Sequence, residues 1–336
     1  MNPSLPDPRP VMDLANAFFG SCVLFTASDA GVFQRLAVKE GLDAAALARD
    51  LELSERGLRL LLDACVAEGL LSKNEGCYSN TPMTRIFLTP GSHADLSTAI
   101  RYNRDIYSAW GKLAQLVRSG APVESPQLHL GDDSDRTRTF VLSMHGRALG
   151  IGRGIVPMLD LKGRKRLLDV GGGPGTFSVL ITNAFPDLHS TVLDLPAVVA
   201  VAAELIESQG ASSRVSIQSG DYHTAPFPVG IDAVNFFGML HQESPDAIRL
   251  LARKAFEALE PGGVVHIMDM MTEASHTAPQ FSALFAITMA LTTENGWVFS
   301  SDELRGWFEE AGFRDFEVSP LPQPLPHWLA KARKPS

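Results

Sequence analysis

The second half of the chain alternates short runs of β-branched and aliphatic residues with longer stretches of helical periodicity. Five such runs follow Lys165, with the sequences RLLDV, STVLD, RVSIQ, IDAVNF and VVHIMD. Strands that alternate with helices pair in parallel and form a doubly wound sheet. Two further runs, DFEVSPL and PHWLAKARK, flank a proline-rich turn and predict a closing antiparallel hairpin. Residues 161–336 are therefore predicted to form an α/β domain with a mostly parallel seven-stranded sheet.

Residues 43–88 show a different order of elements: helix, turn, helix and a short hairpin around Asn74–Gly76. Ser54 stands where the second long helix would begin, and a serine side chain caps free N–H groups at such a position. Gly69 stands where that helix would end, because glycine readily adopts the left-handed conformation that closes a helix. This order is typical of a winged helix, and we predict a helix-rich winged-helix domain over residues 1–95.

Apolar side chains recur at three- and four-residue steps near the N-terminus, which draws one stripe along a helix. The stripe comprises Leu14, Phe18, Cys22 and Phe25. An apolar face so close to a chain end has to be covered, and a second copy of the chain is the cover that we expect. Residues 96–160 are predicted to be a helical connector, rich in large side chains, that forms part of a pocket.

Charge narrows the classes of partner. The 336 residues include 29 lysines and arginines against 38 acidic residues, a formal net charge of −9. A phosphate backbone would meet a repulsive average field, so we expect no nucleic acid partner. Between Gly31 and Pro90, within the predicted winged helix, seven basic residues face eight acidic ones. A module that reads DNA should be clearly basic, which favours a dimerisation role.

Cysteine content and the N-terminus indicate a cellular location. The three cysteines are odd in number and lack the spacing of a zinc site or redox pair, which argues against a disulfide framework. The N-terminus lacks the basic leading region of a signal peptide, and no run reaches the ~18 uncharged apolar residues that a membrane span needs. We therefore expect a cytoplasmic protein that contacts no membrane.

The stretch LLDVGGGPGTFS, Leu167–Ser178, follows the first predicted parallel strand with four glycines in five residues. In an open α/β sheet, ligands bind beyond the carboxyl ends of the strands, where this loop lies. The dinucleotide fingerprint requires a third glycine where this sequence has Thr176 or Ser178, depending on the starting glycine. The phosphate loop of nucleotide hydrolases requires a lysine that is missing here. Neither phosphate-binding motif matches.

Acidic residues follow three successive predicted strands instead. Asp169 precedes the glycines, Asp194 ends the next strand, and Asp221 with Tyr222 follows the third. A carboxylate beside the glycines would repel a pyrophosphate but suits an ammonium group, and Asp194 suits the two hydroxyls of a ribose. Asp221 suits the amino group of adenine, on whose ring Tyr222 can stack. Together they predict a cationic adenosine cofactor without phosphates, and S-adenosylmethionine (SAM) fits.

These motifs resemble those of the class I SAM-dependent methyltransferases, and among them the small-molecule O-methyltransferases of the caffeate, hydroxyindole and bacterial polyketide type. The resemblance covers nearly the whole chain. It implies a Rossmann-like catalytic domain, a homodimer formed through the winged helix, and S-adenosylhomocysteine (SAH) as a product, with no metal. The residues that would contact the cofactor are Asp169, Gly171, Gly173, Gly175, Asp194, Leu195, Asp221 and Tyr222.

His241 lies just past the fourth parallel strand, in GMLHQES, and the resemblance implies that it is the general base, supported by Asp269. A histidine is suited to this role because its ordinary pKa is about 6.5. A histidine that merely packs at a strand end is the simpler alternative. The family usually reads His-Asp-Trp at this point, whereas Gln242 and Glu243 follow His241 here.

Two further positions depart from the family. Phe237 stands where relatives often have lysine, and a second supporting acid is replaced by Val298, with Glu294 as the nearest substitute. A hydroxyl acceptor gains about 10²–10⁴-fold from a well-placed base, whereas a thiol, thioether or amine needs it less. We therefore expect O-methylation of a small hydroxylated aromatic or polyketide-like metabolite, with S- or N-methylation as the chemical alternative. A winged-helix transcriptional regulator with a metabolite-sensing domain is the alternative from another class.

Large side chains near the predicted cofactor site are candidates for the walls of an acceptor pocket. They are Trp110, Phe140, Met144, His145, Phe237, Met271, Phe285, Met289 and Trp297. Apolar residues at helical spacing more often belong to the core, so about half of this set is expected to touch a ligand. His145 is also a second candidate base, for which a histidine on a helix face is an equally simple interpretation.

Overall fold

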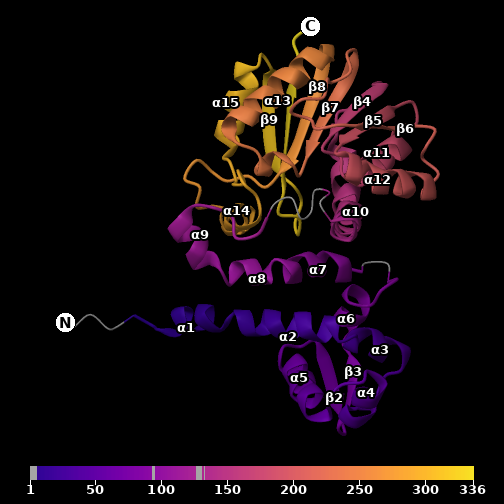
Figure 1. Cartoon of the computed structure of the whole chain (residues 1–336), viewed down its shortest axis with the longest axis vertical. Coiled ribbons are helices and arrows are strands. Elements are labelled where there is room, and N and C mark those ends of the chain that lie inside the picture. The colour runs from indigo at the N-terminus through magenta and orange to yellow at the C-terminus, as the bar shows by residue number, and fades with distance from the viewer. Residues whose placement is uncertain (1–5, 93–94, 126–130, 132) are drawn as a thin grey trace. The chain divides into compact units, whose positions relative to one another are not determined.

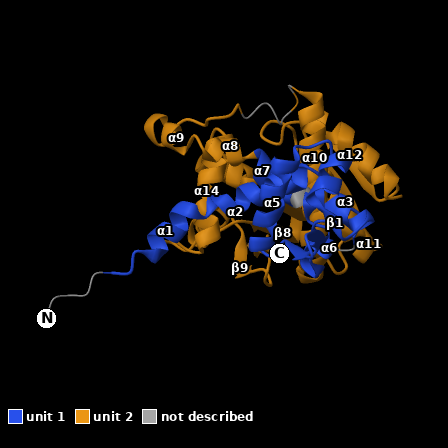
Figure 2. Cartoon of the chain, turned by 90° about the horizontal axis from the view of Figure 1, so that it is seen from below, with its two compact units in different colours: residues 1–105 blue, residues 106–336 orange. Residues whose placement is uncertain are grey.

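The computed structural model describes residues 6–92, 95–125, 131 and 133–336. The chain divides into two compact units, Met1–Asp105 and Ile106–Ser336, which Figure 2 shows in different colours. The predicted winged-helix region falls within the first unit. The predicted α/β domain and most of the predicted connector fall within the second.

The first unit combines helices with a small antiparallel sheet. Its elements are α1 (Arg9–Asn16), α2 (Phe18–Asp29), α3 (Val32–Val38), β1 (Leu42–Asp43), α4 (Ala44–Asp50), α5 (Glu55–Ala67), β2 (Leu71–Asn74), β3 (Cys77–Asn80), α6 (Pro82–Phe87) and α7 (Ser97–Asp105). The strand order is β1–β3–β2, and β2 and β3 form the predicted hairpin. The Ser54 hydroxyl accepts from the Gly57 N–H at the start of α5, and Gly69 has a φ of +71° just past its end. Both predicted boundaries of this helix are confirmed.

The second unit begins with helices and continues as alternating strands and helices. Its elements are α8 (Tyr107–Trp110), α9 (Leu113–Ser119), α10 (Ser134–Ile155), η2 (Val156–Met158), β4 (Arg166–Val170), α11 (Thr176–Ala184), β5 (His189–Asp194), α12 (Pro196–Ser208), β6 (Val215–Ser219), β7 (Ile231–Phe237), η3 (Leu240–Gln242), α13 (Pro245–Ala258), β8 (Leu259–Asp269), α14 (Gln280–Thr292), α15 (Ser301–Glu310), β9 (Arg314–Pro320) and β10 (Trp328–Arg333). Its seven strands have the order β6–β5–β4–β7–β8–β10–β9.

Strand direction in this sheet follows the prediction. The pairs β5–β6, β4–β5, β4–β7 and β7–β8 are parallel, whereas β10 runs antiparallel to both β8 and β9. Each parallel pair is joined through a helix or a long crossover, which places ligand-binding loops at the carboxyl ends of the strands. The Rossmann-like, mostly parallel sheet with an antiparallel C-terminal hairpin is confirmed.

Helices cover both faces of the seven-stranded sheet (Figure 1). On one face, Ile248 of α13 and Phe308 of α15 belong to the same apolar cluster as Leu168 of β4. On the other face, Ile155 of α10 and Ile181 of α11 pack in a cluster with Leu167. Neighbouring residues of β4 thus point to opposite layers, which is why the central strands are apolar without alternation.

The two N-terminal helices keep apolar side chains on the surface of their unit. α1 has no buried residue, and Leu14 and Phe18 are 78% and 50% exposed. A break at Ala17, which the sequence pattern did not predict, separates α1 from α2. Among the described residues, Arg9–Asp29 is the one stretch long and apolar enough to cross a membrane by length and composition.

Gly175 immediately precedes α11 and is expected to be sensitive to substitution. Its φ is +70°, and a Cβ built on it would lie 2.9 Å from Ile206 Cδ1. We expect Gly175→Ala to cost about 1–2 kcal/mol through the left-handed backbone alone, since L-residues avoid that region. Gly306, inside α15, is the matched control because a Cβ there meets nothing within 4 Å. Gly306→Ala should leave the protein as stable or up to about 1 kcal/mol more stable. Thermal unfolding measures both effects. Equal shifts of the melting temperature in the two variants would contradict the prediction that the backbone at Gly175 requires glycine.

Candidate active site

Polar residues meet at one edge of the seven-stranded sheet. Because β4, β5, β6, β7 and β8 are parallel, their carboxyl ends lie at the same edge, the one nearest α14 in Figure 1. Each of these strands ends on or is followed by a predicted site residue. In strand order along the chain they are Asp169 with the glycine loop Gly171–Gly175, Asp194, Asp221 with Tyr222, His241, and Asp269.

The glycine loop turns sharply between β4 and α11. Gly171, Gly173 and Gly175 all have positive φ values, of 63°, 53° and 70°. The Gly171 N–H donates to the Leu193 carbonyl at 2.8 Å, which ties the loop to β5. A Cβ on Gly173 would meet nothing within 4 Å, so open space lies over the loop at this residue. A ligand can therefore approach the backbone there.

Asp194 holds the glycine loop from the next strand. Its Oδ2 accepts from the Gly173 N–H and its Oδ1 accepts from the Leu195 N–H, both at 2.8 Å. Burial raises the pKa of this carboxyl, and the two N–H donors oppose that effect. Each carboxylate oxygen accepts more than one hydrogen bond, which leaves capacity for ribose hydroxyls.

Asp169 lies beneath the glycine loop. It is fully buried, and its Oδ2 accepts from the Ser178 hydroxyl at 2.6 Å, while Oδ1 has no partner among the described residues. Burial, with a smaller contribution from Asp194, raises its pKa to about 7. A cation above the loop would stabilise the ionised form. The carboxylates of Asp169 and Asp194 at the glycine loop thus fit SAM, which carries positive charge and no phosphate.

The turn after β6 carries the predicted adenine residues. Asp221 is exposed, and its Oδ1 accepts from the His223 N–H at 2.8 Å. The Tyr222 hydroxyl donates to Glu243 Oε1 at 2.7 Å. Lys254 of α13 fixes the turn, because its Nζ donates to the carbonyls of Tyr222, His223 and Ala225 at 2.5, 3.1 and 2.8 Å.

His241 and Asp269 form a close pair. His241 Nδ1 lies 2.6 Å from Asp269 Oδ1, and the His241 N–H donates to Asp269 Oδ2 at 3.2 Å. The Asp269 side chain is 1% exposed, whereas the His241 side chain keeps 12% of its surface exposed. A carboxylate at Nδ1 fixes the tautomer that carries a proton there, which leaves Nε2 as an acceptor. This arrangement allows His241 to accept a proton at Nε2.

The second supporting acid has no close equivalent. Val298 is buried in an apolar cluster with Met270, Phe285 and Met289, and Glu294 is exposed. Within the described part of the chain, Asp269 is the carboxylate that contacts the imidazole of His241. Support therefore comes from the β8 side.

Four of the predicted pocket residues lie near His241, or on or against the helix that faces it, and the others lie elsewhere. The Phe285 ring lies edge-on to the His241 ring, with centroids 5.2 Å apart, and the Trp297 N–H donates to the His241 carbonyl at 3.0 Å. Met289 shares the apolar cluster of Phe285. Trp110 of α8 contacts α14, the helix that carries Phe285 and Met289, because its Nε1 donates to the Thr288 hydroxyl at 3.1 Å.

The remaining members lie elsewhere in the second unit. Met271 is buried in the cluster below α13 and α15, Phe237 packs edge-on to Phe177, and Phe140 packs on α12. Met144 is half-buried on α10. His145, on the same helix, has its Nδ1 2.7 Å from the hydroxyl of Thr176, the first residue of α11, and burial lowers its pKa. One of its nitrogens is thus engaged with the segment that follows the glycine loop.

Sequence reasoning missed three residues that the fold brings to this region. His223 and Glu243 contact each other, as described below. His327 lies just before β10, whose Trp328 pairs with Asp269 in the sheet register. Its Nδ1 is buried without a partner among the described residues, and burial lowers its pKa to about 4. Asp269 and His241 also act electrostatically on it. Only the register of the C-terminal hairpin reveals this neighbourhood.

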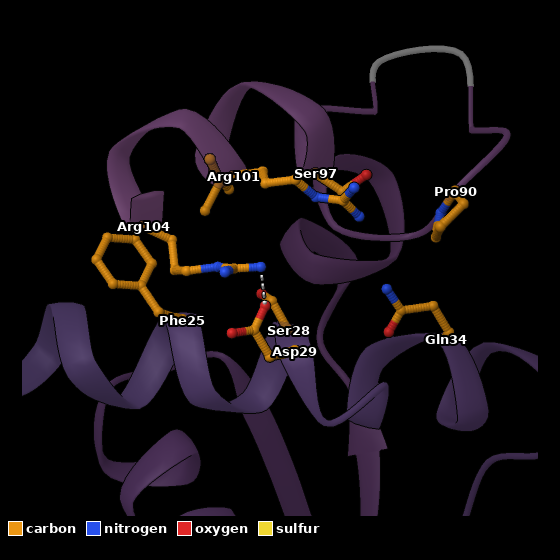
Figure 3. Close-up of a pocket in the computed structure, with 9 residues that line it drawn as sticks. Phe25, Ser28, Asp29, Gln34, Pro90, Ser97, Arg101 and Arg104 are labelled. Atoms are coloured by element: carbon orange, nitrogen blue, oxygen red, sulfur yellow. Dashed lines mark ion pairs between the residues drawn. The ribbon is translucent and has the colours of Figure 1, made fainter. Parts of the chain in front are cut away.

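The first unit has a pocket of its own between α2 and α7 (Figure 3). Asp29 of α2 and Arg104 of α7 form an ion pair there at 3.1 Å, and Gln34 lies at the same pocket. None of the predicted site residues lines it.

Two family profiles match the chain. The O-methyltransferase domain matches residues 120–314, and the O-methyltransferase dimerisation domain matches residues 12–90. The chain therefore belongs to the O-methyltransferase family and is a SAM-dependent methyltransferase with a dimerisation domain.

Individual relatives agree with this membership. The chain is 30% identical over 314 residues to 3-hydroxy-5-methyl-1-naphthoate 3-O-methyltransferase of Streptomyces sahachiroi, covering 92% of this chain and 90% of that protein. It is 32% identical over 329 residues to acetylserotonin O-methyltransferase of Mus musculus, covering 91% and 84%. The crystal structure of human N-acetylserotonin methyltransferase in complex with SAM matches over the whole of both chains, with a TM-score of 0.88 and 27% identity. SAM as the cofactor is thus confirmed.

Proposed function

We propose that this protein transfers the methyl group of SAM to a hydroxyl group of a small aromatic or polyketide-like metabolite, with His241 as the general base. The observation that carries the proposal is the 2.6 Å contact of His241 Nδ1 with the buried Asp269, at the sheet edge where the candidate cofactor residues gather. A base held in one tautomer is needed for a hydroxyl acceptor and much less for a thiol or amine.

The candidate cofactor residues divide the adenosine moiety among three strands. Asp194 accepts from the ribose hydroxyls, beside Leu195, while it holds Gly173 in place. Asp221 accepts from the adenine amino group, and the Tyr222 ring stacks on the adenine. Asp169 supplies negative charge beneath Gly171 and its neighbours. SAM, when bound, supplies a methyl group activated by its sulfonium.

His241 removes the proton from the acceptor. Asp269 stabilises the imidazolium that results, because its carboxylate is buried against Nδ1 and cannot exchange this partner for water. Apolar side chains around His241, with Phe285 edge-on to its ring, exclude water and favour a flat acceptor. The residues that we propose for this wall are Trp110, Phe285, Met289 and Trp297.

The relatives support a hydroxylated aromatic acceptor, and they also define the alternative. One relative is named as a 3-O-methyltransferase of a hydroxynaphthoate and another as an acetylserotonin O-methyltransferase. However, the chain is also 29% identical to an N,N-dimethyltransferase of Streptomyces rimosus. N-methylation is therefore the second candidate, and the His241–Asp269 pair favours oxygen over nitrogen.

A mass-shift screen tests the acceptor class. The protein is incubated with SAM and a panel of hydroxylated aromatics, thiols and amines, and each mixture is examined for a gain of one methyl group. We expect turnover among the hydroxylated aromatics and none among their analogues that lack the hydroxyl. Turnover confined to thiols or amines would contradict the proposal.

We further propose that the protein is a homodimer in which residues 1–95 form the interface, 96–160 contribute to the acceptor pocket and 161–336 carry out catalysis. The exposed apolar face of α1 and α2 lies within the region matched by the dimerisation domain, apart from the first few residues of α1. Contact with a partner subunit would bury this face, and each Å² of apolar surface removed from water stabilises the dimer by about 25 cal/mol. Light scattering on the purified protein should give the mass of a dimer, and the mass of a monomer would contradict this proposal.

A further inference from the structure

A chain of titratable groups connects the turn after β6 with the segment that carries His241. His223 Nδ1 lies 2.8 Å from Asp221 Oδ1, and His223 Nε2 lies 2.8 Å from Glu243 Oε2. The other oxygen of Glu243 accepts from the Tyr222 hydroxyl at 2.7 Å. Glu243 stands two residues after His241, at the point where the sequence departs from the family's His-Asp-Trp.

Glu243 is buried and fastened at both its side chain and its backbone. Its side chain is 9% exposed, so an ionised carboxylate there needs partners, and both oxygens have one. Its carbonyl accepts from Trp297 Nε1 at 2.9 Å, while the Trp297 N–H donates to the His241 carbonyl. Glu243 therefore joins three segments: the turn of Asp221, η3 with His241, and the stretch that leads into α15.

Between two ionised carboxylates, the geometry favours a doubly protonated His223. An ionised carboxylate only accepts hydrogen bonds, and a neutral imidazole carries one N–H. A neutral His223 could donate to Asp221 or to Glu243, and its other nitrogen would then place a lone pair against a carboxylate oxygen. The imidazolium satisfies both contacts, and these bonds are charge-assisted.

The charges that face His223 favour the same form. Burial opposes the cation, but Glu243 and then Asp221 outweigh it through hydrogen bonds and Coulombic attraction, so the pKa of His223 is raised. Tyr222 stays protonated, because burial and Glu243 raise its pKa well above the usual range. Lys254 holds the backbone of the turn from α13, and burial lowers its pKa.

We propose that His223 is a positioning residue for the adenine of the cofactor: as an imidazolium it clamps Asp221 to Glu243, and when it loses its proton the clamp opens and cofactor affinity falls. The backbone N–H and the Nδ1 of His223 both contact Oδ1 of Asp221, which leaves Oδ2 to accept from the adenine amino group. This inference rests on the proposed placement of adenine at Asp221 and Tyr222.

The sign of the pH dependence follows from the protonated state that binds. Below the raised pKa of His223 the clamp is closed and affinity is highest, and affinity falls as pH rises through that pKa. By linkage, a bound ligand lowers the acid dissociation constant of His223 by the same factor by which protonation strengthens ligand binding, and its pKa rises accordingly. The Asp221 half of the clamp is exposed to solvent, so most of the effect depends on the buried Glu243.

Calorimetry of SAH between about pH 6 and about pH 9 tests the proposal. 5′-Methylthioadenosine is measured in parallel, since it shares the adenosine moiety but lacks the titrating amino-acid group. We expect the dissociation constant of both ligands to rise about tenfold over this range in the wild-type protein, which corresponds to a shift of about one pKa unit. The His223 ring resonances should show the reciprocal rise in pKa when SAH is bound.

Three variants and a control separate positioning from a merely structural role. His223→Gln should bind SAH more weakly at low pH and show no pH step, while Glu243→Gln should move the step to lower pH because an anion beside His223 is lost. Tyr222→Phe keeps the ring and both carboxylates, so it should keep the step. His189→Gln, at an exposed histidine that begins β5, is the matched control and should behave like the wild type.

Failure of this inference differs from failure of the proposed cofactor placement. If Asp221→Asn weakens SAH binding but the wild-type affinity is independent of pH, the clamp is wrong and the placement of adenine stands. If Asp221→Asn leaves SAH binding unchanged at every pH, the placement itself is wrong. Should His223→Gln not fold, the shifted step in Glu243→Gln and the ring titration of the wild type still decide the question.

Discussion

Asp194→Ala is expected to weaken SAM binding at least about a hundredfold. The carboxylate accepts from the N–H groups of Gly173 and Leu195 and, in our proposal, from the ribose hydroxyls as well. Hydrogen bonds to a charged group contribute about 1.5–3 kcal/mol each, so the loss of two amounts to about 3–6 kcal/mol. A factor of one hundred corresponds to about 2.7 kcal/mol, and the prediction is therefore a lower bound.

Calorimetric titration with SAM and SAH measures this effect. Asp187→Ala is the matched control, because Asp187 is an exposed aspartate in the turn before β5 and makes no proposed contact with the cofactor. Asp194→Ala should unfold near the wild-type temperature or modestly below it, because the glycine loop keeps its hydrogen bond from the Gly171 N–H to the Leu193 carbonyl. Binding of SAM by Asp194→Ala within threefold of the wild type would show that the ribose lies elsewhere.

His241→Ala is expected to lower kcat for a hydroxyl acceptor by about 10²–10⁴-fold while SAH affinity stays near the wild-type value. The side chain contacts Asp269 and Phe285, neither of which is among the proposed cofactor residues. Asp269→Asn should have a smaller effect in the same direction, because Nδ1 loses the carboxylate that fixes its tautomer.

His145 provides the comparison for this prediction, since the sequence offered it as a second base. Its Nδ1 is engaged by the Thr176 hydroxyl, and no carboxylate contacts its ring among the described residues. At saturating SAM, single-turnover rates should fall far more in His241→Ala than in His145→Ala. The reverse order would transfer the role of base to α10.

The seven strands were predictable because their signal is local. Runs such as RLLDV and VVHIMD are buried on both faces, so they are mostly apolar, and each carries an aspartate at its carboxyl end or one residue before it. Capping was predictable for the same reason, since the Ser54 hydroxyl accepts from the Gly57 N–H at the start of α5, as its place in the sequence indicated. The placement of four aspartates and a histidine at one edge of the sheet then follows from parallel topology alone.

Contacts between segments were not predictable. Glu243 and His223 lie 20 residues apart, and whether they meet depends on how the turn after β6 is held by Lys254. His327 nears Asp269 only through the register of β10 on β8. Among the candidate wall residues, helical spacing alone did not separate Phe285, which faces His241, from Met271, which is buried in the core. Periodicity gives the face of an element but not its neighbour.

The central claim is that the methyl group of SAM is transferred to a hydroxyl oxygen of the acceptor, and that His241 removes the proton of that hydroxyl. The most direct measurement uses SAM labelled with carbon-13 in its methyl group, the hydroxylated acceptor found by the screen, and carbon NMR of the product. We predict that the labelled carbon resonates as a methoxy group, and that the signal accumulates far more slowly with His241→Ala. A labelled N-methyl, S-methyl or C-methyl product from the wild-type protein, or a methoxy product formed equally fast by His241→Ala, would contradict the account.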